Sequence, residues 1–343
     1  MITSFPQTIH NYVFKKAIGK GGFSTVYLVE SEIYHQNYVA KVTPIDLEKP
    51  RTGDIDPLDA EIKALMNLSH QNIIRLYDHF IEGINFFVIL EYCQLGSLQD
   101  SVGEDGLTLQ QFVCYGRQIL SALAFVHSKN IAHRDIKPGN ILVDSMGRIK
   151  LSDFGISILG ANNVVSTFSG SFLYEAPEVI LKKPHNPIQA DIWSLGVLFA
   201  YLINGTTPWR SDNINVLKNR ICTATFKLRS STPPEVAELI TSMLNIEPNE
   251  RPTAQEILEM KLFEKESVEQ TVSENKSIQD VLSPKGRASR RSIPKNRSSF
   301  EPQSKAINIF KMNLMVGNNN MPMIRNRYHS GQVSTFMLDE EAV

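Results

Sequence analysis

Residues 133–140 read HRDIKPGN, and the apolar run ILV follows them at 141–143. Charged and amide side chains are concentrated here, a short way after another apolar run at 123–126. The pattern predicts a polar loop that leads into a short strand. Ordering so many polar side chains in a loop costs free energy, which indicates that the loop carries a function.

A second polar stretch, DFG at 153–155, follows the short predicted strand IKL at 149–151. Its carboxylate, Asp153, and the amide of Asn140 in the first loop can converge on one cation. Mg²⁺ prefers carboxylate and amide oxygens together with phosphate oxygens and water. The two loops together therefore predict a Mg²⁺ site beside a phosphate-bearing ligand.

Near the start of the chain, residues 19–26 read GKGGFSTV. These glycines are either ordinary turn residues or the mark of a dinucleotide fold, which needs a helix directly after them. Residues 26–29 (VYLV) continue instead as a predicted strand, so the glycines join two antiparallel strands and let backbone N–H groups approach phosphates. The next strand carries Lys41, either as a phosphate-binding lysine or as a solvated strand residue.

The composition bounds the class of protein. The chain of 343 residues is 42% apolar and 21% charged, as in soluble globular proteins. Its 35 basic and 36 acidic residues nearly cancel, which excludes a global field that would select nucleic acid or an acidic membrane. The cysteines show no CxxC spacing, so we expect reduced thiols in a cytoplasmic or nuclear protein. We expect neither a signal peptide nor a membrane span, because the longest apolar run, 192–203, is too short to cross a bilayer.

Apolar periodicity suggests how the chain is organised. Alternating or β-branched segments predict strands at residues 12–18, 25–30, 37–43, 73–79 and 85–92. Helical periodicity is found at residues 57–68, 109–128, 188–204, 234–244 and 253–262. A strand-rich front and a helix-rich back predict an α+β fold of two lobes with a cleft between them.

The last part of the chain differs in composition, because it is rich in Ser and Asn and lacks sustained periodicity. We therefore set these boundaries: a leader at 1–11, a domain at 12–264 with lobes of about 12–92 and 93–264, and a mostly disordered tail at 265–343. A basic cluster at 285–297 lies in the tail. It is a solvated linker, a nuclear-import or anionic-surface patch, or a segment that docks on the lobes or on a calmodulin-like partner. Composition favours the linker.

These motifs, in this order, resemble the eukaryotic protein kinase family over about residues 12–264. The resemblance implies a two-lobed kinase fold, with a β-rich N-lobe that contains one main helix, a helical C-lobe, and ATP in the cleft. It also implies transfer of the γ-phosphoryl group of ATP to serine or threonine hydroxyls of proteins. Lys137 and Ser171 occupy positions typical of the serine/threonine type, and the wider pattern is most similar to the calmodulin-dependent or energy-sensor-like branch.

The resemblance also implies roles for single residues. Those implied for ATP binding are Ile18, Gly19, Gly21, Val26, Val39, Lys41, Glu91, Cys93 and Leu142. Those implied for catalysis are Lys41 with its ion-pair partner Glu61, Asp135 and Lys137. Asp135 would accept or orient the substrate hydroxyl proton, and Lys137 would steady the γ-phosphate. Asn140 and Asp153 would bind Mg²⁺.

Other matching residues are expected to serve as scaffold. Glu178 and Arg251 are the expected buried ion pair between the activation segment and the lower lobe. His133 and Phe154 are expected to form an apolar stack between the lobes, together with Leu65 and Leu76.

Regulation and specificity are implied at four positions. Thr167, in the activation segment, is expected to carry a phosphate that an upstream kinase adds and that Arg134 binds. Gly139 and Ser97 stand where arginine-selecting members carry acids, so we expect no main selection for arginine upstream of the acceptor. Two other functions compete with that of a serine/threonine protein kinase. One is a pseudokinase, a binding or scaffold protein on the same fold, and the other is a small-molecule phosphotransferase on a related fold.

Overall fold

The computed structural model describes residues 5–21, 24–45, 62, 65–66, 68–154, 158–159 and 172–264. All of them belong to one of the two units into which the chain divides, Met1–Gln303. The expectations for Glu61, Thr167 and Ser171, for most of the helix at 57–68, and for the tail at 265–343 lie outside the described residues.

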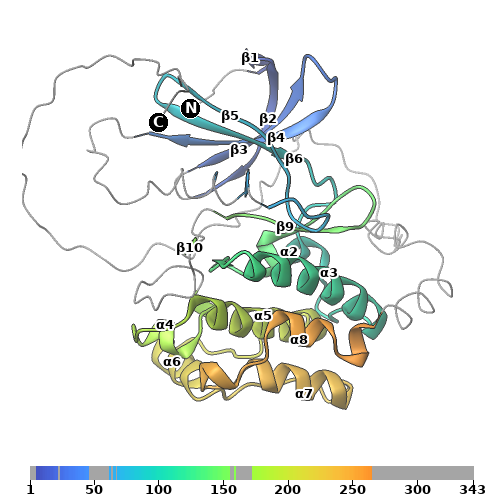
Figure 1. Ribbon diagram of the computed structural model, residues 1–343, viewed down its shortest axis with the longest axis vertical. Coiled ribbons are helices and arrows are strands. Elements are labelled where there is room, and N and C mark those ends of the chain that lie inside the picture. The colour runs from blue at the N-terminus through green and yellow to red at the C-terminus, as the bar shows by residue number, and fades with distance from the viewer. Residues whose placement is uncertain are drawn as a thin grey trace, which may run out of the picture. The chain divides into compact units, whose positions relative to one another are not determined.

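An antiparallel sheet forms the N-terminal lobe, at the top of Figure 1. Its strands, in spatial order, are β1 (Gln7–Ile9), β2 (Tyr12–Lys20), β3 (Thr25–Ser31), β4 (Asn37–Pro44), β6 (Asn85–Glu91) and β5 (Leu76–Glu82). Side chains alternate between the faces of a strand. On β4, Tyr38, Ala40 and Val42 are therefore buried in the lobe's own core, and Val39 and Lys41 lie on the opposite face.

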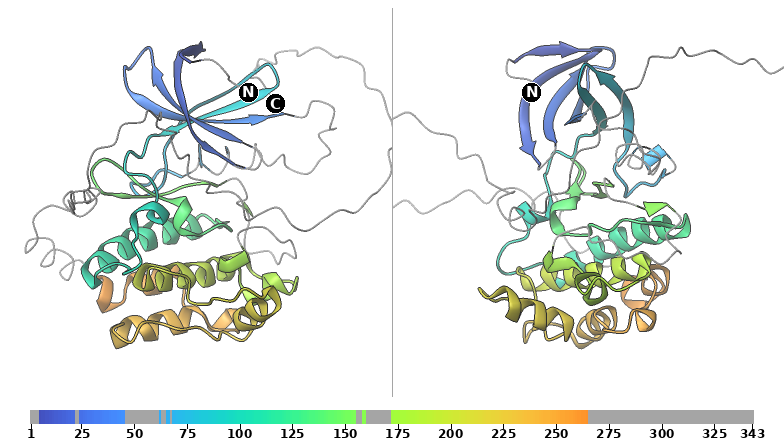
Figure 2. Two further views of the ribbon diagram at one scale, coloured as in Figure 1. Left: turned by 180° about the vertical axis from the view of Figure 1, so that it is seen from behind. Right: turned by 90° about the vertical axis from the view of Figure 1, so that its left-hand side faces the viewer.

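Helices form most of the C-terminal lobe, which Figure 2 shows from two further sides. They are α2 (Leu98–Ser101), α3 (Leu109–Ser128), α4 (Pro177–Ile180), α5 (Pro187–Asn204), α6 (Ile214–Cys222), α7 (Pro234–Met243) and α8 (Ala254–Leu258). Single 3₁₀ turns lie at Pro138–Asn140, Phe172–Tyr174, Pro248–Glu250 and Lys261–Phe263. Short antiparallel pairs, β7 (Ile131–Ala132) with β10 (Ile158–Leu159) and β8 (Ile141–Val143) with β9 (Ile149–Leu151), lie on the side that faces the sheet.

Helix α5 is the centre of this lobe, because most of its residues are buried. A helix that is apolar nearly all round belongs in a core. The Asn186 side chain caps its start by accepting the N–H of Ile188 at 2.9 Å. It ends at Gly205, whose φ is +74° and where an added Cβ would lie 2.4 Å from the carbonyl oxygen of Glu104, so only glycine fits there.

The strand expected at 73–79 begins only at Leu76 and continues to Glu82. Ile73 and Ile74, each 2% exposed, pair with the other lobe instead. Ile73 forms a parallel bridge with Leu151, and the Ile74 N–H donates to the Leu151 carbonyl at 2.9 Å. Apolar periodicity cannot reveal which partner a buried segment chooses, so the expected start was wrong.

The helix expected at 253–262 is also shorter in the structure. α8 begins at a capping box between Thr253 and Glu256 and ends at Leu258. A separate 3₁₀ turn then buries Phe263 beside Phe112 of α3. The sequence did not predict α6 or β1, and β1 lies within the expected leader at 1–11, so residues 7–9 belong to the sheet.

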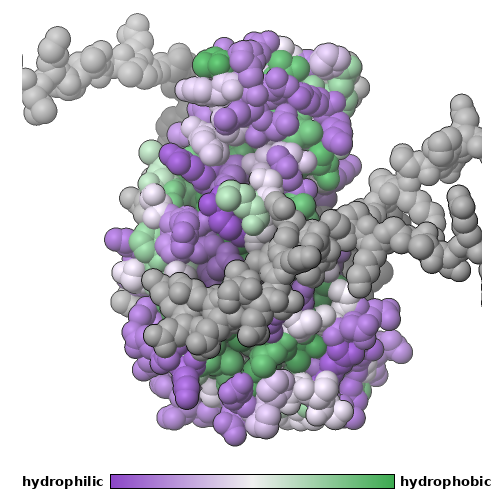
Figure 3. Space-filling view, turned by 90° about the vertical axis from the view of Figure 1, so that its right-hand side faces the viewer, coloured by the Kyte–Doolittle hydropathy of each residue, from purple (hydrophilic) through white to green (hydrophobic). Residues whose placement is uncertain are grey.

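Hydrophilic residues predominate on the face drawn in Figure 3, and apolar side chains gather there in smaller patches. Within the part of the chain that the structure describes, no helix is both long and apolar enough to cross a bilayer.

A buried ion pair joins α4 to the segment ahead of α8, which confirms the expected scaffold contact. Arg251 Nη1 and Nη2 contact the Glu178 carboxylate oxygens at 2.7 and 2.9 Å, and the Arg251 side chain is 0% exposed. Arg251 also donates to the carbonyls of Asn245 and Gln189 at 2.8 and 2.9 Å. Its guanidinium lies 5.1 Å from the centre of the Trp193 ring.

Replacing Arg251 by Met should lower the free energy of unfolding by about 3–5 kcal/mol, because it leaves the Glu178 carboxylate buried without a partner. Urea denaturation of the full chain measures this change. Arg229→Met is the matched control, since Arg229 pairs with the exposed Asp105 at 3.2 Å and should show little change. Equal losses in both variants would contradict a structural role for the buried pair.

Candidate active site

The polar loop after β7 is held in place by Asp191 of α5, which is 1% exposed. Its carboxylate accepts the backbone N–H groups of His133 and Arg134, each at 2.7 Å, and contacts His127 Nε2 at 3.0 Å. Arg134 has a φ of +69°, a conformation that costs free energy in a non-glycine residue. The Asp191 hydrogen bonds stabilise that conformation, so the loop takes a defined course into the cleft.

The expected catalytic residues Asp135 and Lys137 lie together with Asn140. Lys137 Nζ contacts the Asp135 carboxylate, and Asn140 Nδ2 donates to this carboxylate and to the Asp135 carbonyl, both at 2.8 Å. The Asn140 carbonyl accepts the N–H and the hydroxyl of Ser152, both at 2.9 Å. Because the amide nitrogen of Asn140 is committed to Asp135, its side-chain oxygen is the atom left to ligate a cation.

His133 connects this loop to the second one. Its ring is buried, and Nε2 donates to the Ser152 carbonyl at 2.9 Å. The ring centre lies 4.7 Å from that of Phe154, which confirms the expected contact. Leu65 belongs to the same apolar cluster as Phe154, and Leu76 packs against that cluster.

An ion pair across the cleft joins the lobes: Lys41 Nζ of β4 lies 3.0 Å from Asp153 Oδ1, just after β9. Burial works to raise the pKa of Asp153, but the charge and hydrogen bond of Lys41 outweigh it and hold that pKa below its usual range. Asp153 is therefore ionised at neutral pH and able to bind a cation. The expected partner of Lys41, Glu61, lies outside the described residues.

The oxygen atoms of Asn140 and Asp153 suit Mg²⁺, a hard cation that accepts amide and carboxylate ligands. The backbone carbonyl of Asn140 accepts a hydrogen bond from Ser152, the neighbour of Asp153. The segments that carry the two candidate ligands are therefore hydrogen-bonded to each other. No group of three or more His, Cys, Asp or Glu residues forms a metal site among the described residues. Mg²⁺ keeps several waters and takes phosphate oxygens as ligands, so two protein ligands are enough for a site of the kind found beside nucleotides.

Three of the residues expected around the nucleotide lie on one face of the sheet. Val26 of β3 lies directly opposite Lys41 of β4, and Val39 lies opposite Leu90 of β6. Opposite residues of antiparallel strands share a face. The structure thus brings Val26, Val39 and Lys41 together on the side from which Lys41 reaches Asp153.

The other residues expected to contact the nucleotide lie on different elements and differ in exposure. Gly19 pairs with Val26, and Gly21 donates its N–H to the Ser24 carbonyl at 2.7 Å. Ile18 is 44% exposed, whereas Leu142 forms a bridge with Ser97 and packs against the core of the C-terminal lobe.

Glu91 is the last residue of β6, and Cys93 follows it two residues later. Burial raises the pKa of the Cys93 thiol to about 12, so it remains a neutral thiol. The Glu91 N–H donates to the Arg75 carbonyl at 2.9 Å, which leaves the carbonyl as the backbone group that Glu91 can offer to a base.

Glu91 also forms an ion pair that the sequence did not reveal. Lys150 Nζ of β9 lies 2.9 Å from Glu91 Oε1, with side-chain exposures of 8% and 18%. Lys150 lies in the three-residue strand IKL, all of which is buried, and no spacing rule links it to a residue so far away in the sequence. The pair fastens the segment that joins the lobes to the strand ahead of Asp153.

Comparison with known proteins agrees with this geometry. A family model described as protein kinase domain matches residues 12–263. The maternal embryonic leucine zipper kinase of Xenopus laevis is 35% identical over 263 residues, which cover 75% of this chain and 40% of that protein. CBL-interacting serine/threonine-protein kinase 13 of Arabidopsis thaliana is 34% identical over 74% of this chain and 51% of its own length. The probable serine/threonine-protein kinase MARK-A of Dictyostelium discoideum is 35% identical over 73% of this chain and 24% of its own length. The chain thus spans about half or less of each of these relatives.

Asp153→Asn should weaken binding of MgATP at least about tenfold, equivalent to about 1.4 kcal/mol, because it removes a charge that the cation would meet. Isothermal titration calorimetry with and without Mg²⁺ measures this change. Asp212→Asn, at an exposed carboxylate of the same lobe, is the matched control. Unchanged affinity in Asp153→Asn would remove this residue from the cation site.

Proposed function

Because this chain belongs to the protein kinase family, we propose that it transfers the γ-phosphoryl group of ATP to serine and threonine hydroxyls of other proteins. The observation that carries the proposal is the convergence of charged groups in the cleft. Lys41 comes from one lobe, and Asp135, Lys137, Asn140 and Asp153 come from the other. Positioning and charge stabilisation supply most of the rate of phosphoryl transfer, and this set offers both.

Each group has a distinct part in the proposed reaction. The substrate oxygen forms a bond to the γ-phosphorus as the bond to the ADP oxygen breaks, and Asp135 accepts or orients the hydroxyl proton. Lys137, already beside the Asp135 carboxylate, steadies the transferred group. Asn140 and Asp153 would hold Mg²⁺, which neutralises phosphate charge. Lys41 holds the α- and β-phosphates.

The serine/threonine class rests on Lys137 and on relatives whose names state that class. A pseudokinase is the main alternative, and it usually lacks one of the charged groups that this chain retains. A small-molecule phosphotransferase is a weaker alternative, because the chain has residues 176–178 (APE) and the Arg251–Glu178 ion pair, which in the resembling family shape the peptide-binding platform. Incubating the full chain with radiolabelled ATP and a mixed peptide library separates the proposed function from both alternatives. Label on serine or threonine supports the proposal, and no label on any peptide would contradict it.

Asp135→Asn should lower turnover by about a hundredfold or more, equivalent to about 3 kcal/mol in the barrier, while the fold survives. The same peptide assay measures the rate, and circular dichroism checks the fold. Asp212→Asn serves again as the control and should keep normal turnover. A rate above a tenth of that of the unaltered chain would exclude Asp135 from the catalytic role.

We further propose that phosphorylation of Thr167 by an upstream kinase activates the enzyme. The support lies in Arg134, next to Asp135 in the loop. Burial lowers the pKa of Arg134, and the nearby carboxylates of Asp191 and Glu175 oppose that effect. Because a guanidinium stays protonated at physiological pH, Arg134 is a cation beside the catalytic residue, and a phosphate of nearly two negative charges could bind to it.

Thr167→Ala should reduce activity about tenfold relative to the chain after treatment with an activating kinase. Mass spectrometry reports the phosphate, and the peptide assay reports the rate. Ser166→Ala is the neighbouring control. Equal activity of Thr167→Ala, together with no loss on phosphatase treatment, would rule this mechanism out.

Partners and location remain predictions. The protein substrates are those that carry accessible serine or threonine, and absence of strong arginine selection follows from Gly139 and Ser97. An added Cβ at Gly139 would meet nothing within 4 Å, so the position is open and uncharged. A calmodulin-like partner for the basic cluster at 285–297 and a cytoplasmic or nuclear location are further proposals.

A further inference from the structure

Among the residues that the structure describes, one buried carboxylate next to the catalytic loop (residues 133–140) has no hydrogen-bond partner. Glu175 lies between the 3₁₀ turn Phe172–Tyr174 and α4, and it is 5% exposed. Neither of its carboxylate oxygens forms a hydrogen bond with any described part of the chain. Glu178 and Asp191 are buried to a similar degree, but each is held by several donors. Burial without donors favours the neutral acid over the carboxylate, so Glu175 differs chemically from both.

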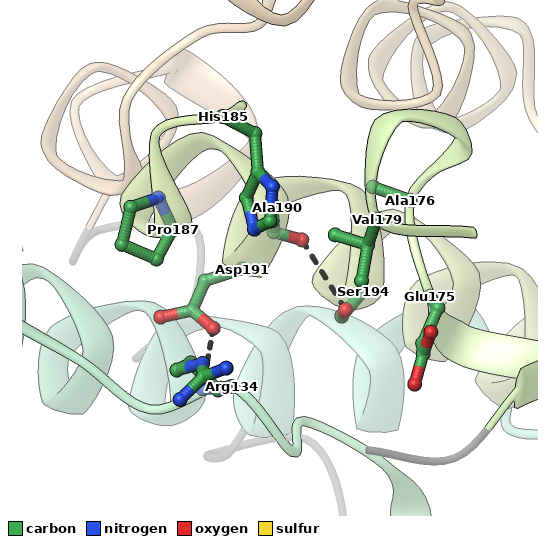
Figure 4. A pocket seen from close by; sticks show the side chains of 9 residues that line it. All are labelled: Arg134, Glu175, Ala176, Val179, His185, Pro187, Ala190, Asp191 and Ser194. Carbon is green, nitrogen blue, oxygen red and sulfur yellow. Dashed lines mark hydrogen bonds between the residues drawn. The ribbon is translucent and has the colours of Figure 1, made fainter. Parts of the chain in front are cut away.

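The space beside Glu175 is small. A cavity of about 20 Å³ is lined by Glu175, Arg134, His185, Asp191 and Ser194, among others (Figure 4). In that view, dashed lines join Arg134 to Asp191 and Ser194 to Ala190, and none reaches Glu175. A volume of this size holds one water molecule at most. The cavity is therefore too small for the side chain of a peptide, which argues against a role of Glu175 in binding one.

Within the described residues, the charged groups that face Glu175 come from three parts of the fold. Arg134 and Asp135 belong to the catalytic loop, Asp191 to α5, and His185 to the segment that leads into α5. The charge of Asp191 is balanced by its donors, and His185 Nδ1 donates to the Lys183 carbonyl at 2.8 Å. Asp135 therefore opposes ionisation of Glu175, whereas Arg134 favours it. Burial first, and then Asp135, raise the pKa of Glu175 to about 7, even though Arg134 lowers it.

We propose that Glu175, buried beside Asp135 without hydrogen-bond donors, is a positioning residue that exchanges a proton and thereby acts on phosphoryl transfer through Asp135. This inference rests on the proposed kinase function. When Glu175 is protonated, Asp135 meets the substrate hydroxyl without a second carboxylate charge beside it. When Glu175 ionises, it adds negative charge next to Asp135 and near the negatively charged phosphoryl group. Transfer should then slow by about three- to tenfold, as expected for charges several ångströms apart in a partly buried site.

The first test compares the dependence of kcat/KM on pH between about 6 and 8 in the unaltered full chain and in Glu175→Gln. The peptide substrate lacks histidine, and both proteins receive the same MgATP, so ionisation of the nucleotide affects both equally. The unaltered chain should lose activity as the pH rises through about 7, and Glu175→Gln should stay at the level of the low-pH form. Glu235→Gln, at an exposed position of α7, is the matched control and should keep the original profile.

Identical pH profiles for Glu175→Gln and the unaltered chain would overturn the proposal. So would a changed preference for basic residues in the peptide with an unchanged profile, because that result would assign Glu175 to substrate binding.

A second test needs no enzyme activity, so it stands even if the proposed function fails. In the full chain labelled with ¹³C at glutamate Cδ, one resonance should titrate with a midpoint near 7, while those of exposed glutamates titrate near their usual value of about 4.3. This resonance should be absent from Glu175→Gln. If the variant does not fold, the titration of the unaltered chain decides alone. A chain in which every glutamate titrates below about 5.5 would overturn the inference.

Discussion

The carboxylate of Asp191 is the contact on which the catalytic loop depends. It accepts two backbone N–H groups and contacts the ring nitrogen of His127, and it does so from near the start of α5, the helix at the centre of the lobe. A carboxylate in such a place is tolerable because its donors satisfy it. The same bonds stabilise the positive φ of Arg134, which turns the chain so that Asp135 enters the cleft. The Asp191 side chain thus connects the buried helix α5 to the loop that carries the catalytic residue Asp135.

From this fixed loop, contacts extend to the other lobe along two routes. Backbone hydrogen bonds of Ile74 with Leu151, and of Leu151 with Asn72, tie the entry to β5 to the strand ahead of Asp153. The Lys150–Glu91 ion pair holds the same strand to the segment that joins the lobes. Both routes end beside Asp153, which explains how a residue of the C-terminal lobe is placed within reach of Lys41 on the sheet.

Buried charges in this domain fall into two kinds. In the first kind, hydrogen-bond partners satisfy the charged group: Arg251 donates to the Glu178 carboxylate, and Asp191 accepts backbone N–H groups. Removing a partner would leave a buried charge uncompensated. Glu175 has no such set, although it lies a few residues from Glu178 in the same chain segment. The first kind stabilises one arrangement of the lobe. The second kind, Glu175, has no hydrogen bonds that hold it in the ionised form, so it can exchange a proton. It lies near Asp135, the residue proposed to accept or orient the proton of the substrate hydroxyl.

The order and spacing of HRDIKPGN and DFG, together with the period of the apolar residues, were enough to predict two lobes, the long helices α3 and α5, and the residues that gather around Asp135. Such features are local, since strand alternation, helical periodicity and loop polarity are properties of neighbouring residues. Other features depend on partners far away in the chain. Ile73 and Ile74 pair with Leu151 and do not belong to the expected strand. β1 pairs with β2 at the edge of the sheet, and Lys150 forms an ion pair with Glu91. The exceptional state of Glu175 also belongs to the fold, because burial and missing donors arise only when α4, α5 and the catalytic loop pack together. The sequence by itself determined which groups could perform the chemistry, and only the tertiary structure decided which of them are paired, buried or left with a proton to exchange.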